Sequence, residues 1–445
     1  MSLREGETGA GLGGRTWGWI VLLGLVGQLA WTVENMYLNV FVHETISDDP
    51  NVLALLVSTS AAAATLATLL VGAWSDRTGR RREFIAVGYV LWGVTTAGFG
   101  LVSPDRAGDL APAQEAVAIA VISIVLLDCV MSFLGSGAND AAYQAWVTDN
   151  TTPANRGKVD GVIQAMPLLA MLVVFGALDP MTQDGQWRAF FAIVGGVTAA
   201  VGLMAWFGLR GVQPAARPGG SYLATVVHGL RPSTVRAAPR LYLTLGAWAV
   251  LGASFQVFLP FLIIYVERYL EIEAYAVVLG SVLVGASLLS MLGGRLLDRA
   301  GPMRALPAVV AGYVAGLLLM FLARGMAAVI LAGILAIGGF LLAVAALSAT
   351  VRNLTPLDRA GQVQGLRMIS AILLPSVVGP FIGAAVISGA DETYVDLGVT
   401  KQVPTPGIFV AAAVVAVLVL LPIAALRRLG APGPHTPEPR EEIAA

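Results

Sequence analysis

The stretch GAWSDRTGRRR, from Gly72 to Arg82, decides the fold of this chain. It lies between two apolar segments, near residues 52–74 and 84–103. Each segment has about 20 residues, which is enough to cross a membrane hydrocarbon core of about 30 Å. A short charged turn between two such segments indicates two membrane-spanning helices that are joined at one membrane surface.

The composition of the whole chain supports a membrane protein. Of its 445 residues, 57% are hydrophobic and only 12% are charged, whereas a soluble domain carries about 25% charged residues. The chain is therefore expected to lie in a lipid bilayer, with its first span retained because no secretory signal is apparent. The single cysteine, Cys129, excludes an intrachain disulfide and a cysteine-rich metal site.

Twelve apolar stretches are long enough to cross the bilayer. They lie near 17–42, 52–74, 84–103, 116–147, 159–179, 189–209, 241–266, 274–297, 305–323, 327–350, 366–388 and 407–426. The fourth stretch is too long for a straight span, and Gly135-Ser136-Gly137 predicts a bend within it. The expected fold is an all-α membrane protein.

The basic residues predict the orientation of these spans, because Lys and Arg collect on the cytoplasmic side. Of the 27 basic residues, only five are assigned to the other side, namely Arg106, Arg188, Arg268, Arg324 and Lys401. Both termini are therefore expected in the cytoplasm. Arginine supplies nearly all of the basic residues, which hints at a GC-rich bacterial genome, and the expected location is the bacterial inner membrane.

A repeat divides the chain into two halves. Asp76, Arg77 and Gly79 recur as Asp298, Arg299 and Gly301, and TPANRGKVDG (Thr152 to Gly161) recurs as TPLDRAGQVQG (Thr355 to Gly365). This order predicts two six-helix halves, 1–210 and 241–428, with a cytoplasmic linker at 211–240 and a tail at 429–445. Parallel repeats usually hold the substrate between the halves, near the bilayer midplane.

Twelve spans in two halves, with G-x-x-x-D-R-x-G-R-R after the second span, resemble the major facilitator superfamily. The resemblance implies that residues 72–82, here named the latch loop, hold one half against the other and release it during transport. Gly72 would let two helices approach closely, and Asp76 would accept hydrogen bonds from a helix N-terminus. The implied latch residues are Gly72, Asp76, Arg77, Gly79, Arg80, Arg81 and Arg156.

Shorter motifs resemble those of sugar symporters. These are V-E-x-x-Y at Val33 to Tyr37, and ND…Q…D at Asn139 to Asp149 followed by T-P-x-x-R-G. The closest likeness is to the sucrose transporters and the related glycoside–pentoside–hexuronide cation symporters. Sucrose transporters usually carry an arginine late in the fourth span, where this chain has Gln144, a candidate substrate contact.

Three acidic residues lie inside predicted spans, namely Glu34, Asp128 and Asp140. A charge at the centre of a span costs roughly 2.5–3.5 kcal/mol, so each needs a reason. Because burial disfavours the charged form of a carboxylate, all three are candidates for proton or cation coupling. The resemblance places Asp140 near the cation-coordinating aspartate of melibiose-type symporters.

A polar stripe follows the first span. Gln28, Trp31, Asn35 and Asn39 recur at three- and four-residue spacing, and Tyr37 flanks them. Such a stripe faces lipid only at high cost, so it is expected to face a central cavity and contact substrate, together with Gln256 of the seventh span. In the alternative interpretation, these amides hydrogen-bond one helix to another.

The remaining features exclude other functions. No nucleotide-binding P-loop or nucleophile elbow is present, the three histidines are not spaced for a metal site, and nothing indicates a nucleic-acid partner, so neither an enzyme nor a cofactor is expected. Because no Lys or Arg lies in the middle of a span, a neutral substrate is favoured. The expected function is uptake of a neutral sugar or glycoside with H⁺ or Na⁺, by a monomer working through alternating access. The alternatives are proton-coupled efflux of drugs or metabolites, and a sensor that does not transport.

Overall fold

The computed structural model describes residues 12–104, 112–209, 231–355, 360–396 and 399–429. Residues 12–209 are here named the first half and residues 231–429 the second half. The predicted linker lies outside the described residues up to residue 230, as does the predicted tail beyond residue 429. Within the rest of the linker, α12 (Pro232–Ala237) is helical and α13 begins at Pro239.

The described part of the first half contains six membrane-length helical units. They are α1 (Gly14–Thr32) with a π-helical segment (Val33–Leu38) and α2 (Asn39–Thr45); α3 (Pro50–Thr78); α4 (Arg81–Phe99); α6 (Ala113–Gly135) with a π-helical segment (Ser136–Tyr143) and α7 (Gln144–Asp149); α8 (Pro153–Val173) with a π-helical segment (Val174–Leu178) and α9 (Asp179–Gln183); and α10 (Trp187–Gly208).

The described part of the second half contains six more. They are α13 (Pro239–Phe258) with a 3₁₀ turn (Leu259–Phe261), α14 (Leu262–Ile264) and a π-helical segment (Tyr265–Tyr269); α15 (Tyr275–Ala300); α16 (Pro302–Leu322); α17 (Met326–Asn353); α18 (Ala360–Met368) with a π-helical segment (Ile369–Leu373) and α19 (Leu374–Ala390); and α20 (Gly407–Val417) with α21 (Leu420–Arg428).

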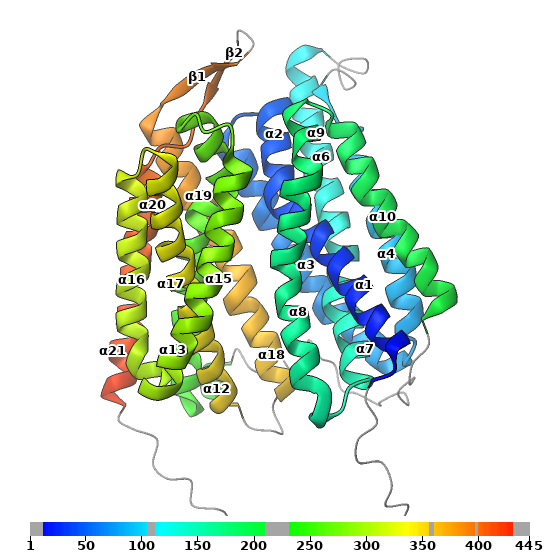
Figure 1. The fold of residues 1–445 in the computed structure, drawn as a ribbon, viewed down its shortest axis with the longest axis vertical. Coiled ribbons are helices and arrows are strands. Elements are labelled where there is room, and N and C mark those ends of the chain that lie inside the picture. The colour runs from blue at the N-terminus through cyan, green and yellow to red at the C-terminus, as the bar shows by residue number, and fades with distance from the viewer. Residues whose placement is uncertain (1–11, 105–111, 210–230, 356–359, 397–398, 430–445) are drawn as a thin grey trace, which may run out of the picture.

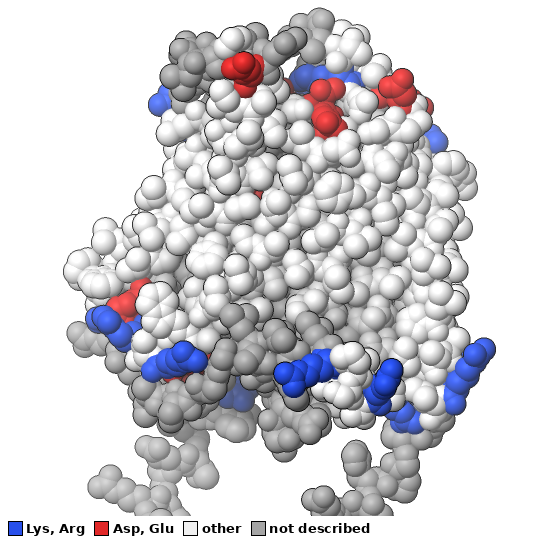
Figure 2. Space-filling view, turned by 180° about the vertical axis from the view of Figure 1, so that it is seen from behind, with Lys and Arg blue, Asp and Glu red and all other residues white. Residues whose placement is uncertain are grey.

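Eleven of these units are long and apolar enough to cross a membrane. The twelfth is α4, whose 19 residues begin with the charged turn Arg81-Arg82-Glu83. The two halves lie side by side with their helices roughly along one direction (Figure 1). In the face shown in Figure 2, Lys, Arg, Asp and Glu gather at the two ends, and the belt between them is almost free of charge. The predicted all-α membrane fold is confirmed.

The turn between α3 and α4 has a local cause. Pro50 occupies the first turn of α3, and the carboxylate of Asp49 caps the helix by accepting from the backbone N–H of Asn51 at 2.9 Å. At the other end, Gly79 adopts a left-handed conformation with φ of 68°. Glycine populates this region at little cost, so α3 stops there and α4 starts two residues later.

Helices in each half pack closely where glycines meet. In the first half, α4 packs against α10, and a Cβ added to Gly93 would lie only 2.3 Å from the backbone oxygen of Gly195. Two backbones can approach this closely only when both residues lack side chains. Between the halves, α3 packs against α19.

π-helical segments interrupt several spans, including the first and the fourth. The bend predicted at Gly135-Ser136-Gly137 corresponds to the start of the π-helical segment Ser136–Tyr143. A π-helical turn pairs residue i with residue i+5 instead of i+4, and such turns are frequent at functional sites. The first span has its own π-helical segment, which contains Glu34.

A β-hairpin marks one end of the molecule. Strands β1 (Thr393–Asp396) and β2 (Val399–Gln402) pair antiparallel, with Tyr394 opposite Lys401. Figure 1 shows this hairpin at the top, whereas α1 begins and α21 ends at the bottom. These two ends are here named the hairpin end and the terminal end.

At the hairpin end, contacts join the two halves. Glu44 of the first half forms an ion pair with Arg268 and accepts at its backbone oxygen from Lys401 Nζ at 2.9 Å. The backbone N–H of Gln402 donates to Asp48 Oδ2 at 2.8 Å. These contacts are here named the hairpin clasp, and they join the two halves at the hairpin end.

Candidate functional site

A central cavity of about 360 Å³ lies between the two halves. The first half contributes residues of the first, second and fourth spans, and the second half contributes residues of the seventh and eleventh. The polar or aromatic lining residues are Gln28, Trp31, Glu34, Asn35, Asn39, Ser60, Thr65, Asp128, Ser136, Asp140, Gln256 and Ser376. Seven of the predicted substrate contacts and coupling acids line the cavity from the first and fourth spans of the first half, and Gln256 lines it from the second half. Their roles stay predictions.

Among the three predicted coupling acids, Glu34 and Asp128 each have an oxygen atom without a hydrogen-bond partner in the described structure. Glu34 is 8% exposed and accepts from Ser132 Oγ at 2.5 Å through Oε1, while its Oε2 has no hydrogen-bond partner among the described residues. Asp128 is 1% exposed, and its Oδ1 likewise has no partner in the described structure. A buried polar atom without a partner costs about 1–3 kcal/mol, so each oxygen favours a bound donor or cation.

Asp140 differs from the other two acids because both of its oxygens are paired. Ser136 Oγ donates to Oδ2 at 2.9 Å, and the amide of Asn139 donates to Oδ1 at 3.0 Å. All three residues belong to the π-helical segment Ser136–Tyr143. The local structure therefore holds Asp140 in place, and Asp140 has less need of a ligand than Glu34 or Asp128.

The amides of the first span have fixed orientations. Asn35 Nδ2 donates to the backbone oxygen of Trp31 at 2.8 Å, and Asn39 Nδ2 donates to the backbone oxygen of Asn35 at 2.9 Å. Since a backbone oxygen only accepts, the amide nitrogen must occupy that position. Asn39 Oδ1 is left buried without a partner in the described part of the chain. From the second half, Gln256 Nε2 donates to Ser376 Oγ at 2.8 Å.

Two predicted substrate contacts lie outside the cavity lining. Tyr37 is fully buried, and its hydroxyl donates to Asp179 Oδ1 at 2.7 Å. It follows Asn35 by two residues, about half a turn of the π-helical segment Val33–Leu38, so it points away from the polar stripe. Gln144 is exposed at the start of α7 and is likewise not a lining residue.

The sequence-based search missed Asp179. This carboxylate is 2% exposed and accepts from Tyr37, from Tyr275 of the second half at 2.5 Å, and from Gln183 at 2.7 Å. Asp179 was placed at the very end of the predicted fifth span, 159–179. Helix α9 instead continues to Gln183, so Asp179 is inside the bundle.

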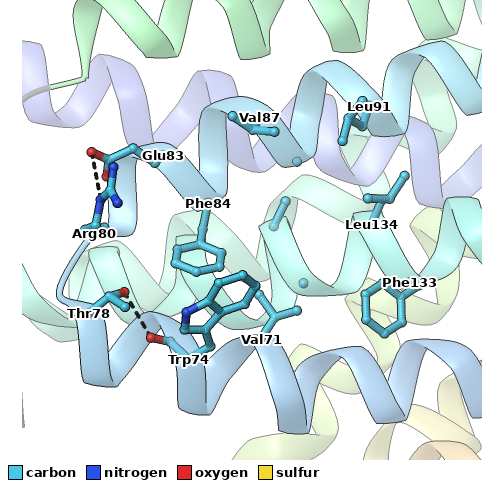
Figure 3. Close-up of a pocket in the computed structure, with 13 residues that line it drawn as sticks. Val71, Trp74, Thr78, Arg80, Glu83, Phe84, Val87, Leu91, Phe133 and Leu134 are labelled. Atoms are coloured by element: carbon cyan, nitrogen blue, oxygen red, sulfur yellow. Dashed lines mark hydrogen bonds and ion pairs between the residues drawn. The ribbon is translucent and has the colours of Figure 1, made fainter.

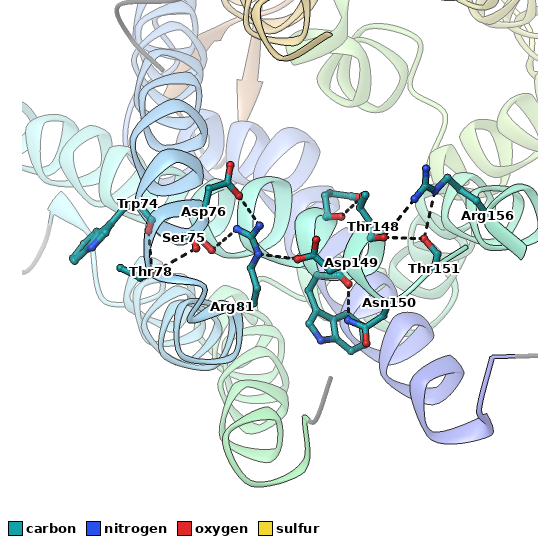
Figure 4. Close-up of polar contacts among 12 residues, drawn as sticks. Trp74, Ser75, Asp76, Thr78, Arg81, Thr148, Asp149, Asn150, Thr151 and Arg156 are labelled. Atoms are coloured by element: carbon teal, nitrogen blue, oxygen red, sulfur yellow. Dashed lines mark hydrogen bonds and ion pairs between the residues drawn. The ribbon is translucent and has the colours of Figure 1, made fainter. Parts of the chain in front are cut away.

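Around the latch loop, Arg81 is the central residue (Figure 4). Its guanidinium lies 2.5 Å from Asp76 Oδ1 and 3.2 Å from Asp149 Oδ2, and it donates to Ser75 Oγ at 2.9 Å. Asp76 was expected to accept from a helix N-terminus. The structure instead pairs it with the side chain of Arg81, which ties the turn after α3 to the end of α7.

The other latch residues are less constrained. Arg80 is 65% exposed and lies 3.4 Å from Glu83, while Arg156 lies 3.5 Å from Thr151 Oγ1. Arg77 is in the last turn of α3. A Cβ on Gly72 would meet Ala141 at 3.6 Å, an ordinary contact, so the predicted need for close approach at Gly72 is wrong. In the second copy of the motif, Gly301 again has a positive φ, of 83°, whereas the side chain of Asp298 lies outside the described residues.

A separate apolar groove of about 380 Å³ lies between α3, α4 and α6 (Figure 3). Its lining includes Trp74, which is 62% exposed and lies 5.1 Å from Phe84 between ring centroids, with the Arg80–Glu83 pair at its rim. The groove contains no residue of the polar stripe and no coupling acid, and its apolar surface suits lipid.

Two six-helix halves around a polar cavity are the architecture of membrane transporters that are built from two repeats. The sequence profile of the Major Facilitator Superfamily matches residues 20–380 and 278–445. The chain therefore belongs to the Major Facilitator Superfamily, and it is a membrane transporter rather than an enzyme.

Solved structures share this fold at low sequence identity. A point mutant of the nucleoside transporter NupG is 14% identical with a TM-score of 0.70, covering 92% of this chain and 98% of its own. A bacterial homologue of the human lysosomal transporter Spinster, in an inward-facing and unoccupied conformation, is 17% identical with a TM-score of 0.64, covering 94% and 97%. Among curated proteins, none matches this chain.

Proposed function

We propose that this transporter takes up a neutral sugar or glycoside together with a proton or another cation. The central cavity, which both halves line, is the proposed substrate site, and Glu34 and Asp128 are the proposed coupling acids. The observation that carries the proposal is the pair of buried, unpartnered carboxylate oxygens beside the amides of the polar stripe. Amide and hydroxyl groups suit the hydroxyls of a sugar, and Trp31 offers a flat apolar face to its ring.

The proposed coupling follows from the cost of burying charge. An empty, ionised carboxylate disfavours closure of the cavity around it, because closure removes the remaining water. Binding of a proton or cation at Glu34 or Asp128 neutralises that charge and lowers the cost of closure. The cavity can then switch from opening on one side of the membrane to opening on the other only when substrate and ion are bound together.

The proposed orientation places the terminal end in the cytoplasm of a bacterium, as the distribution of basic residues supports. The hairpin end then faces outward, and the hairpin clasp closes the outer side. We assign the latch role to Arg81 with Asp76 and Asp149, and the protein is proposed to act as a monomer.

The test is uptake of a radiolabelled panel of sugars and nucleosides into proteoliposomes, with and without an inward proton or sodium gradient. Nucleosides belong in the panel because they are themselves glycosides. We expect gradient-driven accumulation that Glu34→Gln abolishes while substrate exchange persists. The matched control is Asp184→Asn, which removes an exposed carboxylate in the turn after α9.

Two results would contradict the proposal. Accumulation that Glu34→Gln leaves intact would remove Glu34 from the coupling mechanism. Transport of a substrate in the direction opposite to the proton flow would favour the alternative, proton-coupled efflux.

A further inference from the structure

The unpartnered buried atoms of the central cavity are mostly of one chemical kind. Glu34 Oε2, Asp128 Oδ1 and Asn39 Oδ1 lack partners in the described structure, and all three only accept hydrogen bonds. The fourth such atom is the hydroxyl of Thr65, which is 3% exposed and can accept or donate. All four residues line the same cavity.

The donors around this cavity are largely used within the protein. Ser132 donates to Glu34, Ser136 donates to Asp140, and the Gln256 amide donates to Ser376. Asn35 and Asn39 each have an amide hydrogen committed to a backbone oxygen. None of the described lining residues is Lys or Arg. The cavity therefore offers many acceptors, two of them on carboxylates, and few free donors.

We propose that this cavity also accepts an amine-bearing sugar or glycoside, whose ammonium group binds Glu34 and Asp128 in place of the coupling ion. The proposal rests on the function proposed above. An ammonium group has three donors and one positive charge, which matches two carboxylate oxygens and the oxygen of Asn39. A hydroxyl group of a neutral sugar has one donor and no charge.

Glu34 and Asn39 come from the same interrupted turn. They are five residues apart, and the π-helical segment Val33–Leu38 lies between α1 and α2. Because π-helical pairing joins residues i and i+5, it brings positions five apart onto one face of the span. Asp128 lines the same cavity from the fourth span. Trp31 and Gln256 also line it and would contact the sugar ring and its hydroxyls.

The proposal has a consequence for energetics. A neutral sugar would need a separate ion to neutralise the acids, so its accumulation would depend on the ion gradient. An amine-bearing sugar brings its own charge. Its uptake would respond to membrane potential and would persist without a proton or sodium gradient.

The experiment measures binding to the purified full-length protein by isothermal titration calorimetry in near-neutral buffer, where the amines of the probes are still largely protonated. The probes are two matched sets: glucosamine, glucose and N-acetylglucosamine, and galactosamine, galactose and N-acetylgalactosamine. In at least one set we expect the amine to bind about tenfold more tightly than both neutral members. Asp128→Asn is expected to remove this preference, and Asp184→Asn is expected to keep it.

Folding is checked by size-exclusion profile and thermal unfolding, and Asn39→Leu provides a second variant that leaves both acids in place. It is expected to weaken amine binding by severalfold. Equal binding of amine and neutral members, a preference that survives in Asp128→Asn, or no amine binding would overturn the proposal. Proton-driven uptake of a neutral sugar without any amine preference would overturn this inference and leave the proposed function standing. Uptake of the amine-bearing sugars but of no neutral sugar would leave this inference standing and overturn the proposed uptake of a neutral sugar.

Discussion

Replacing Arg81 by methionine is expected to destabilise the protein by about 2–4 kcal/mol. The side chain of Arg81 is 8% exposed and lies between two carboxylates. Its bond to the half-buried Asp149 is a charge-assisted hydrogen bond, which contributes about 1.5–3 kcal/mol. Asp76 is 54% exposed, so its pairing with Arg81 is screened by water and adds under about 1 kcal/mol.

The measurement is thermal unfolding of the purified protein in detergent, followed by tryptophan fluorescence. The matched control is Arg80→Met, at the adjacent position. Arg80 is 65% exposed and forms an ion pair with Glu83 at 3.4 Å, so its loss is expected to cost under about 1 kcal/mol.

Equal decreases in unfolding temperature for the two variants would refute this reasoning, because both remove one positive charge from the same loop. An Arg81→Lys variant tests geometry separately from charge. Lysine cannot reach two carboxylates and Ser75 with a planar fork of donors, so it is expected to restore only part of the lost stability.

Three further outcomes are expected. Gly93→Ala should destabilise the α4–α10 contact by about 1–3 kcal/mol, because its Cβ would overlap the backbone of α10, while Gly196→Ala, with nothing within 4 Å, should not; yield of monodisperse protein distinguishes them. Tyr275→Phe removes a donor to the buried carboxylate of α9, at a cost of about 1.5–3 kcal/mol, and should speed hydrogen exchange in the first turn of α15. Unchanged exchange would argue against a role for this contact in joining the halves. Cysteines at Glu44 and Lys401, in a cysteine-free background, should be linked by a short bismaleimide, and uptake should stop; continued uptake in fully linked protein would show that the hairpin end does not open.

The sequence predicted the fold well because membrane spans depend on length and composition, which are local properties. Of the five first-span residues that were predicted to contact substrate, Gln28, Trp31, Asn35 and Asn39 line the cavity, as their helical spacing predicted, whereas Tyr37 does not. Among the twelve helical units of the described structure, α4 alone is not apolar enough over its length to be identified as a span by composition, because its charged first turn belongs to the latch loop.

Side-chain partners were harder to predict, because they depend on contacts between distant segments. Tyr37 was grouped with the polar stripe from its neighbours, yet its partner is Asp179, 142 residues later. Asp179 itself was missed because the sequence does not show that helix α9 continues past it. The difference between Asp140 and Asp128 depends on Ser136 and Asn139, whose hydroxyl and amide reach Asp140 only through the local helical geometry.

The hairpin clasp has a consequence for the concentrations at which the transporter works. Its residues Glu44, Arg268 and Lys401 are separate from the cavity lining, so under the proposed alternating access they would affect the relative populations of the closed and open hairpin end rather than the intrinsic affinity of the site. The apparent affinity for a ligand arriving from that side is the intrinsic affinity multiplied by the open fraction. Each 1.4 kcal/mol of clasp energy lowers a small open fraction about tenfold. Substitutions in the clasp could therefore retune half-saturation over orders of magnitude while selectivity stays the same.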